Sequence, residues 1–206
     1  MRLTKPGDAA ALAMWIAPQA AALCVSAFRL PLSAGFADPA ESAALSVMLA
    51  TQVIAAAALF PAVVADVRRL AMAIAVAWAF AGLACFLSAA ATEPALLAMG
   101  HVALWLGALW AWAAPLARGR WTGLGVAVAM LLTVGGAMAG YLHAEYRPLA
   151  QGTVSGRWWE WSPLLTTLSQ AGEGAILWPG WAATAAVLAG GLAFHAAIRS
   201  RQRAAV

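Results

Sequence analysis

Histidine is the first residue type in this chain whose positions could support chemistry. The chain has three histidines in 206 residues, and two of them, His101 and His143, lie near the ends of consecutive apolar segments. A neutral imidazole can ligate haem iron or hydrogen-bond a quinone. We therefore predict that both contact a ring cofactor, with His101 as the candidate metal ligand. The alternative is that each bonds water or backbone at a membrane surface, as we expect for His195 at the inner end of the last apolar segment.

A tryptophan-rich run is the second feature with chemical potential. It lies in the longest segment between apolar stretches and reads GRWWEWSP over residues 156–163. Trp158, Trp159 and Trp161 would offer a large flat surface with indole N–H donors, which suits a porphyrin or quinone ring. Tryptophan is also enriched where a membrane meets water, so the alternative is an aromatic belt.

The residues after this run predict a short helix. Ser162 is a good N-cap and Pro163 a good first helical residue, so we expect a helix from Pro163 to about Gln170. Lying flat on the membrane surface, it would turn one face to lipid or protein and the other to water. The residues expected on the apolar face are Leu164, Leu165 and Leu168. The residues expected to face water are Thr167, Ser169 and Gln170.

Six apolar runs must position these residues. The chain is 64% hydrophobic and only 10% charged, against roughly 25% charged in soluble domains. Each run is near the roughly 20 residues that a spanning helix needs. The runs are Ala9–Phe28, Ala43–Ala65, Leu70–Ala91, Ala95–Leu116, Trp121–Tyr141 and Ile176–Ile198. We predict an all-α, six-span transmembrane bundle forming one domain over residues 1–206, with a short interfacial helix between spans five and six.

Charge orients the bundle. With the N-terminus in the cytoplasm, nine of the twelve Lys and Arg residues lie on the inner side and six of the eight acidic residues lie outside. Such a positive-inside bias is typical of a membrane protein and gives the net charge of +4 a role that needs no nucleic acid. The inner basic residues are Arg2, Lys5, Arg68, Arg69, Arg118, Arg120, Arg199, Arg201 and Arg203. We therefore predict a bacterial inner-membrane protein with both termini cytoplasmic.

Polar residues inside the spans are few. No Asp, Glu, Lys or Arg lies near the middle of a predicted span, where pumps and proton-coupled carriers usually place one. Gln19 and Gln52 are the most polar mid-span residues, and we expect them to form hydrogen bonds between helices. The short link between spans four and five predicts that these two helices are neighbours, which would bring His101, His143 and the tryptophan run to one cavity.

The tryptophan run resembles the "WWD" signature of haem-handling membrane proteins of cytochrome c biogenesis. The residues that match are Gly156, Trp158, Trp159, Trp161, Leu165 and Thr166. His101-Val102 matches an outer His-Val upstream, so the resemblance spans about residues 101–170. Ser162 stands where the signature has aspartate. The family also has a second outer histidine two helices downstream, whereas this chain has one more helix after the tryptophan run. The resemblance implies a haem site on the outer side.

These observations favour a subunit of a redox or haem-handling assembly, with a periplasm-facing site for a haem or quinone ring. The alternatives are a cofactor-free structural subunit of a larger respiratory or photosynthetic complex, the permease component of a transporter, and a membrane enzyme acting at the outer surface. In each case we expect contacts with lipid and with other membrane subunits.

Overall fold

The structure is a computed structural model that describes residues 6–29, 43–88, 90–116, 121–146, 161–173 and 177–204. Within these ranges the chain is helical apart from short turns, and no strand occurs. The first helices are α1 (Pro6–Arg29), α2 (Ala43–Val63), α3 (Val67–Leu87) and α4 (Thr92–Leu116). The fifth span comprises α5 (Thr122–Met130), the π-helix η2 (Leu131–Gly135) and α6 (Gly136–Tyr146). The last helices are α7 (Pro163–Glu173) and α8 (Trp178–Ala204).

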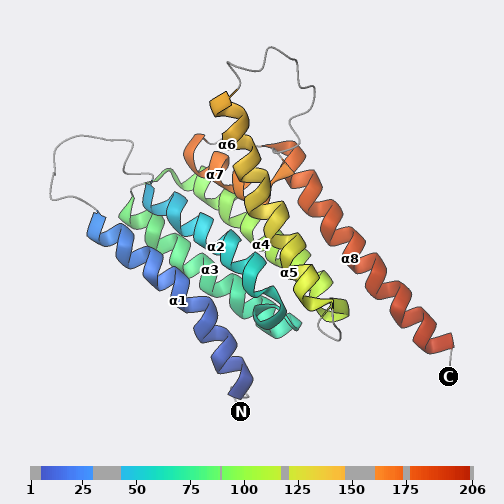
Figure 1. Ribbon diagram of the computed structural model, residues 1–206. Coiled ribbons are helices and arrows are strands. Elements are labelled where there is room, and N and C mark those ends of the chain that lie inside the picture. The colour runs from blue at the N-terminus through green and yellow to red at the C-terminus, as the bar shows by residue number, and fades with distance from the viewer. Residues whose placement is uncertain are drawn as a thin grey trace.

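Six of these segments are long and apolar enough to cross a membrane. They correspond to the six predicted runs, with ends that differ by a few residues, so the predicted six-span helical bundle is confirmed. The chain is a multi-pass membrane protein. The start of α1 and the end of α8 lie at the same end of the bundle, and α7 lies at the opposite end (Figure 1).

Helices α2 and α4 form the centre of the bundle. About half of each is buried inside the protein, 50% for α2 and 56% for α4, against 17% for the fifth and sixth spans. Helix α4 packs against α2, α3, α7 and α8. Helix α5 packs chiefly on α2 and touches α4 only slightly, so the expected close pairing of spans four and five is wrong. The short link brings the two helices together at one end, but packing then directs α5 onto α2.

A glutamine pair joins the first three spans, as the sequence predicted. The Gln52 side-chain amide nitrogen donates to Oε1 of Gln19 at 3.0 Å and to the Ala77 carbonyl at 2.8 Å. The Gln19 amide nitrogen donates to the Trp15 carbonyl at 2.9 Å. These bonds connect α1, α2 and α3 where water cannot compete.

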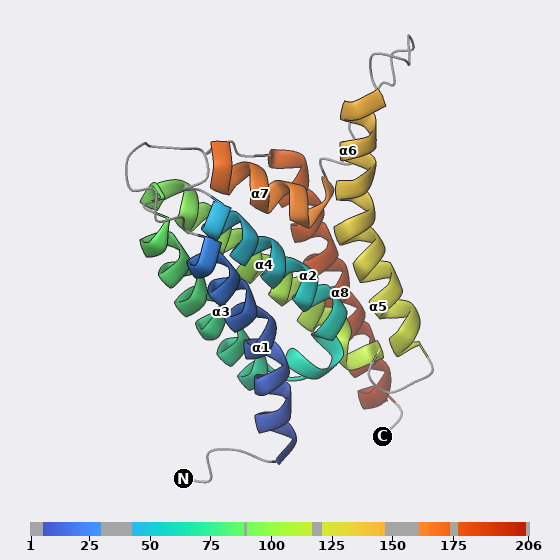
Figure 2. The same cartoon turned by 60° about the vertical axis from the view of Figure 1, so that its left-hand side comes forward.

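Helix α7 is the short helix predicted after Ser162, and it continues to Glu173. It runs across the end of the bundle instead of along the spans (Figure 2). The expected water-facing side is wrong, because Thr167 and Gln170 are fully buried. The helix packs against α2, α4 and α8, and its polar side meets protein instead of water.

Candidate functional site

His101 lies at the junction of three helices. Its side chain, on α4, has no exposed surface. The Nδ1 atom lies 2.9 Å from the Thr167 hydroxyl on α7, and Nε2 lies 3.2 Å from the Thr184 hydroxyl on α8. The ring therefore joins the transverse helix to two spans.

Trp181 closes one side of this junction. Its indole ring meets the imidazole edge-on, with ring centroids 5.1 Å apart and planes at 60°. Because Trp181 and Thr184 are three residues apart on α8, they lie on one face of that helix. One face of α8 thus supplies both a hydroxyl and an aromatic ring to His101.

The four hydrogen bonds around His101 need four protons, but the two threonine hydroxyls and a neutral imidazole together supply three. The Thr167 hydroxyl also donates to the Pro163 carbonyl at 2.8 Å, and the Thr184 hydroxyl donates to the Gly180 carbonyl at 2.9 Å. Four bonds then share three protons, two from hydroxyls and one from a neutral imidazole. Either the Pro163 or the Gly180 carbonyl gives up its hydroxyl partner, depending on which ring nitrogen holds the proton.

A fourth proton would fill all four bonds but would leave a buried imidazolium. No ion pair to His101 occurs among the described residues. An unpaired buried charge is expensive in free energy. The neutral ring, with one helical carbonyl lacking its additional hydroxyl donor, is therefore the resting form of the network.

The fifth span holds the start of α7 in place. The Ser162 hydroxyl donates to the Thr133 carbonyl at 2.8 Å, and Thr133 lies in the π-helix η2. A π-turn interrupts the regular α-helical hydrogen-bond ladder, which frees a carbonyl for an outside donor. A Cβ added to Gly136 would lie 2.7 Å from the Ser162 Cβ, so this close approach needs a glycine.

Several buried polar atoms on these helices have no hydrogen-bond partner. Gln170 is fully buried, and neither its amide oxygen nor its amide nitrogen has a partner. The indole N–H groups of Trp105 and Trp181 also lack acceptors. An unsatisfied buried group costs about 1–3 kcal/mol. Trp105 is one turn from His101 on α4, and Gln170 is one turn from Thr167 on α7, so each lies on the same helix face as a member of the network.

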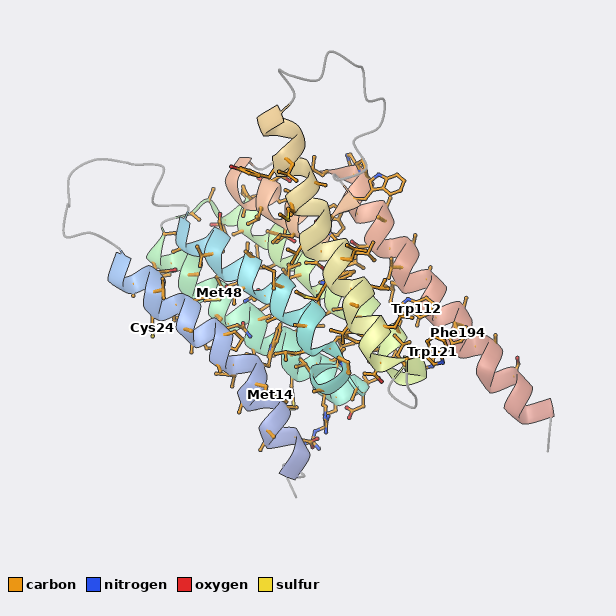
Figure 3. The ribbon with its side chains drawn as sticks, in the orientation of Figure 1. Met14, Cys24, Met48, Trp112, Trp121 and Phe194 are labelled. Atoms are coloured by element: carbon orange, nitrogen blue, oxygen red, sulfur yellow. The ribbon has the colours of Figure 1, made fainter. Side chains whose placement is uncertain are left out.

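Aromatic contacts fasten α4 to α8 on the other side of His101 from α7. Trp112 and Phe194 lie side by side with ring centroids 5.7 Å apart (Figure 3). The Trp112 indole nitrogen donates to the Val187 carbonyl at 3.0 Å. His195, expected at an interface, stacks on Trp110 at 6.2 Å. These contacts make the α4–α8 pair a fixed frame for the His101 junction.

The other predicted site residues are placed only in part. The Trp161 side chain is 60% exposed just before α7. Trp158 and Trp159 lie outside the described residues, as does the His143 side chain, although its backbone belongs to the last turn of α6. Their convergence with His101 stays a prediction. Sequence reasoning missed Trp181 and Thr184; the signal was a threonine one turn after a tryptophan in an otherwise apolar span.

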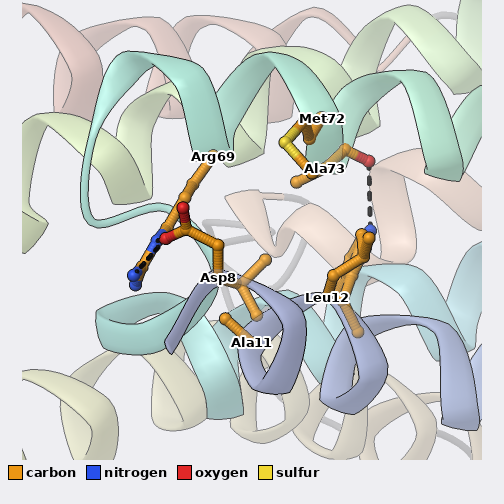
Figure 4. A pocket seen from close by; sticks show the side chains of 8 residues that line it. Asp8, Ala11, Leu12, Arg69, Met72 and Ala73 are labelled. Carbon is orange, nitrogen blue, oxygen red and sulfur yellow. Dashed lines mark hydrogen bonds and ion pairs between the residues drawn. The ribbon is translucent and has the colours of Figure 1, made fainter. Parts of the chain in front are cut away.

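A small cavity at the other end of the bundle is a different kind of feature. It lies between α1 and α3, measures about 20 Å³ and is lined partly by Asp8, Trp15 and Arg69 (Figure 4). Arg69 pairs with Asp8 at 2.7 Å, and the Trp15 indole nitrogen donates to the Ala73 carbonyl at 3.1 Å. Its polar groups bond one another, so this cavity is a structural junction of the first three spans.

The described residues favour hydrogen bonding over metal binding at His101. Both ring nitrogens already have hydroxyl partners, so an axial bond to iron would require one of them to be released. No group of three or more His, Cys, Asp or Glu side chains that could hold a metal occurs among the described residues. Comparison of the chain with protein-family models, curated proteins and solved structures found no match, so a function must come from the site itself.

Proposed function

We propose that this chain is a membrane subunit of a redox or haem-handling assembly, and that a buried cluster beside α7 binds the edge of a quinone or haem ring. This His101 cluster consists of His101, Thr167, Gln170, Trp181 and Thr184. The observation that carries the proposal is the pairing of a fully buried histidine with polar groups that lack partners. His101 is fixed by Thr167 and Thr184, whereas Gln170 on the same helix as Thr167 is left unsatisfied.

The cluster offers both kinds of hydrogen-bonding group that a redox-active ring needs. The Gln170 amide and the Trp181 indole supply donors for a carbonyl oxygen. In the neutral His101 network the carbonyl of Pro163 or Gly180 loses its hydroxyl donor. That carbonyl keeps its helical N–H bond and has a second lone pair that could accept from a ring hydroxyl. These groups suit hydrogen bonding to a quinone. The resemblance of the tryptophan run to haem-handling proteins supports haem as the second candidate.

We place the site at the periplasmic side of a bacterial inner membrane, with both termini in the cytoplasm. The distribution of basic residues supports this orientation. The cluster lies beside α7, at the end of the bundle away from the Asp8–Arg69 pair. A ring bound there could exchange with lipid, or with a partner subunit, at the outer surface.

A cofactor-free structural subunit remains the competing function. It is supported by the His101 network itself, because a histidine bonded to two threonines also serves to lock α7 onto α4 and α8. The two functions differ in whether Gln170 has a ligand.

The test is to purify the protein from its native membrane in mild detergent and identify bound rings. Pyridine haemochrome spectroscopy measures haem, and solvent extraction followed by chromatography measures quinone. We expect one of the two rings in amounts that match the protein. Preparations that contain neither, from cells that produce both, would favour the structural subunit.

A further inference from the structure

Gln170 differs from the other buried glutamines of this protein. Gln19 and Gln52 are equally buried, and the amide nitrogen of each donates to a protein acceptor. Gln170 has no exposed surface and no partner for either amide atom. Oε1 of Gln52 also lacks a partner, but among the described glutamines both amide atoms are unpartnered in Gln170 alone.

Most of the buried side-chain nitrogens without a partner belong to residues at or near the His101 junction, and Nε2 of His195 is a further one toward the other end of α8. Among the described tryptophans, Trp15 and Trp112 donate to the backbone carbonyls of Ala73 and Val187. Trp105 and Trp181 have no acceptor. Trp181 contacts the His101 ring itself, and Trp105 lies one turn from it along α4. Three side chains with free donors thus belong to α4, α7 and α8, which pack together.

Charge restricts what could satisfy these donors. The arginines whose side chains are described, Arg68 and Arg69, lie at the start of α3, at the opposite end of the bundle from α7. An anionic ligand would need a cation, and the described part of the cluster contains none. Gln170 offers both a donor and an acceptor without charge. The chemistry suits a neutral ligand with oxygen atoms that can be carbonyls in one state and hydroxyls in another.

From these observations we infer that Gln170 recognises a neutral quinone-class ring, as its carbonyl in the oxidised form and as its hydroxyl in the reduced form. This inference rests on the proposed function and narrows its ligand. A carbonyl oxygen would accept from the amide nitrogen of Gln170, and a hydroxyl would donate to its amide oxygen.

The experiment compares Gln170→Leu with the intact chain, using a short-chain ubiquinone analogue as the probe. Thermal unfolding of the purified protein in detergent is measured with and without the analogue. We expect the analogue to raise the unfolding temperature of the intact chain, and Gln170→Leu to weaken the apparent affinity by about tenfold or more. Ser169→Ala, a neighbouring change on the same helix, should bind like the intact chain.

The unfolding stability of Gln170→Leu without the analogue shows whether the Gln170 amide waits for a ligand or is already hydrogen-bonded to a buried water. If Gln170 is free until a ligand binds, leucine removes an unsatisfied group, and the variant should be at least as stable as the intact chain. If a buried water satisfies the amide, Gln170→Leu should lose stability and bind the analogue no worse, which would overturn the inference. Haem in the purified protein together with no response to the analogue would also overturn it, while leaving the proposed function intact.

Discussion

At the scale of single residues, the shortage of one proton around His101 is the most testable feature. The ring protonated on Nδ1 donates to Thr167, and the ring protonated on Nε2 donates to Thr184. In each form, one threonine hydroxyl must stop donating to its backbone carbonyl (Pro163 or Gly180) and donate to the unprotonated ring nitrogen instead. The two forms use the same set of groups, so we expect both to be populated.

Removing either hydroxyl should therefore select one form. Thr167→Val leaves Thr184 as the only acceptor, so the ring proton should move to Nε2; Thr184→Val should move it to Nδ1. The measurement is nitrogen NMR of the imidazole in protein labelled at histidine, which is tractable because the chain has only three histidines. Thr51→Val, on α2, is the control and should leave the His101 signals unchanged. Equal signals in both site variants would contradict the network.

The sequence could indicate His101 but not its partners. A histidine near the end of an apolar segment is conspicuous, and its burial fits a site residue. Thr184 is 83 residues away, and a threonine in an apolar helix ordinarily bonds the carbonyl four residues earlier, as this one also does. Nothing in the local pattern shows that the same hydroxyl reaches a histidine on another helix.

At the scale of helices, α7 shows what local signals can and cannot predict. Ser162 and Pro163 correctly marked its start, because capping depends on neighbouring residues. The pattern predicts water contact for its polar face, because a surface helix normally turns that face outward. Here Thr167 and Gln170 face protein, and such an inversion follows from tertiary contacts with α4 and α8 that periodicity does not contain.

The seating of α7 on the fifth span should be sensitive to one methyl group. Gly136→Ala would place a Cβ 2.7 Å from the Ser162 Cβ and 3.5 Å from its Cα, so the N-terminus of α7 must move. We expect a loss of about 1–3 kcal/mol in the free energy of unfolding, typical of overpacking. Thermal unfolding in detergent measures the change.

The matched control for this change is Gly82→Ala in α3. A Cβ added at Gly82 meets nothing within 4 Å, so this variant should be at least as stable as the intact chain, because alanine favours a helix over glycine. Equal stability of Gly136→Ala and Gly82→Ala would mean that Ser162 does not approach the fifth span as closely as the structure places it.

At the scale of the whole molecule, span number was predictable and packing order was not. Bilayer thickness sets the length of each apolar run, so six runs imply six spans. The packing of α5 on α2 depends on which helix faces fit together. A helix that is apolar on every side gives no sequence signal for which side meets which neighbour. The expected pairing of spans four and five therefore failed although the spans themselves were correct.

The orientation of the bundle is a separate prediction. With both termini cytoplasmic, a reporter fused after Val206 should be active in the cytoplasm, and one inserted near Gln151 should report the periplasm. Paired reporters that work only on opposite sides of the membrane measure this directly. The reverse pattern would place the His101 cluster at the cytoplasmic face and overturn the proposed outer site.

The most direct test of the central claim is the ring content of purified His101→Ala. His195→Ala is the matched control, because His195 also contacts a tryptophan ring between α4 and α8 but lies toward the other end of α8 from His101's partners. Haem is measured by pyridine haemochrome spectroscopy, quinone by extraction and chromatography, and correct folding by membrane yield and thermal unfolding. We predict that the intact chain and His195→Ala carry the same ring, and that His101→Ala inserts normally but loses it. Equal ring content in His101→Ala and the intact chain would contradict a site built around His101.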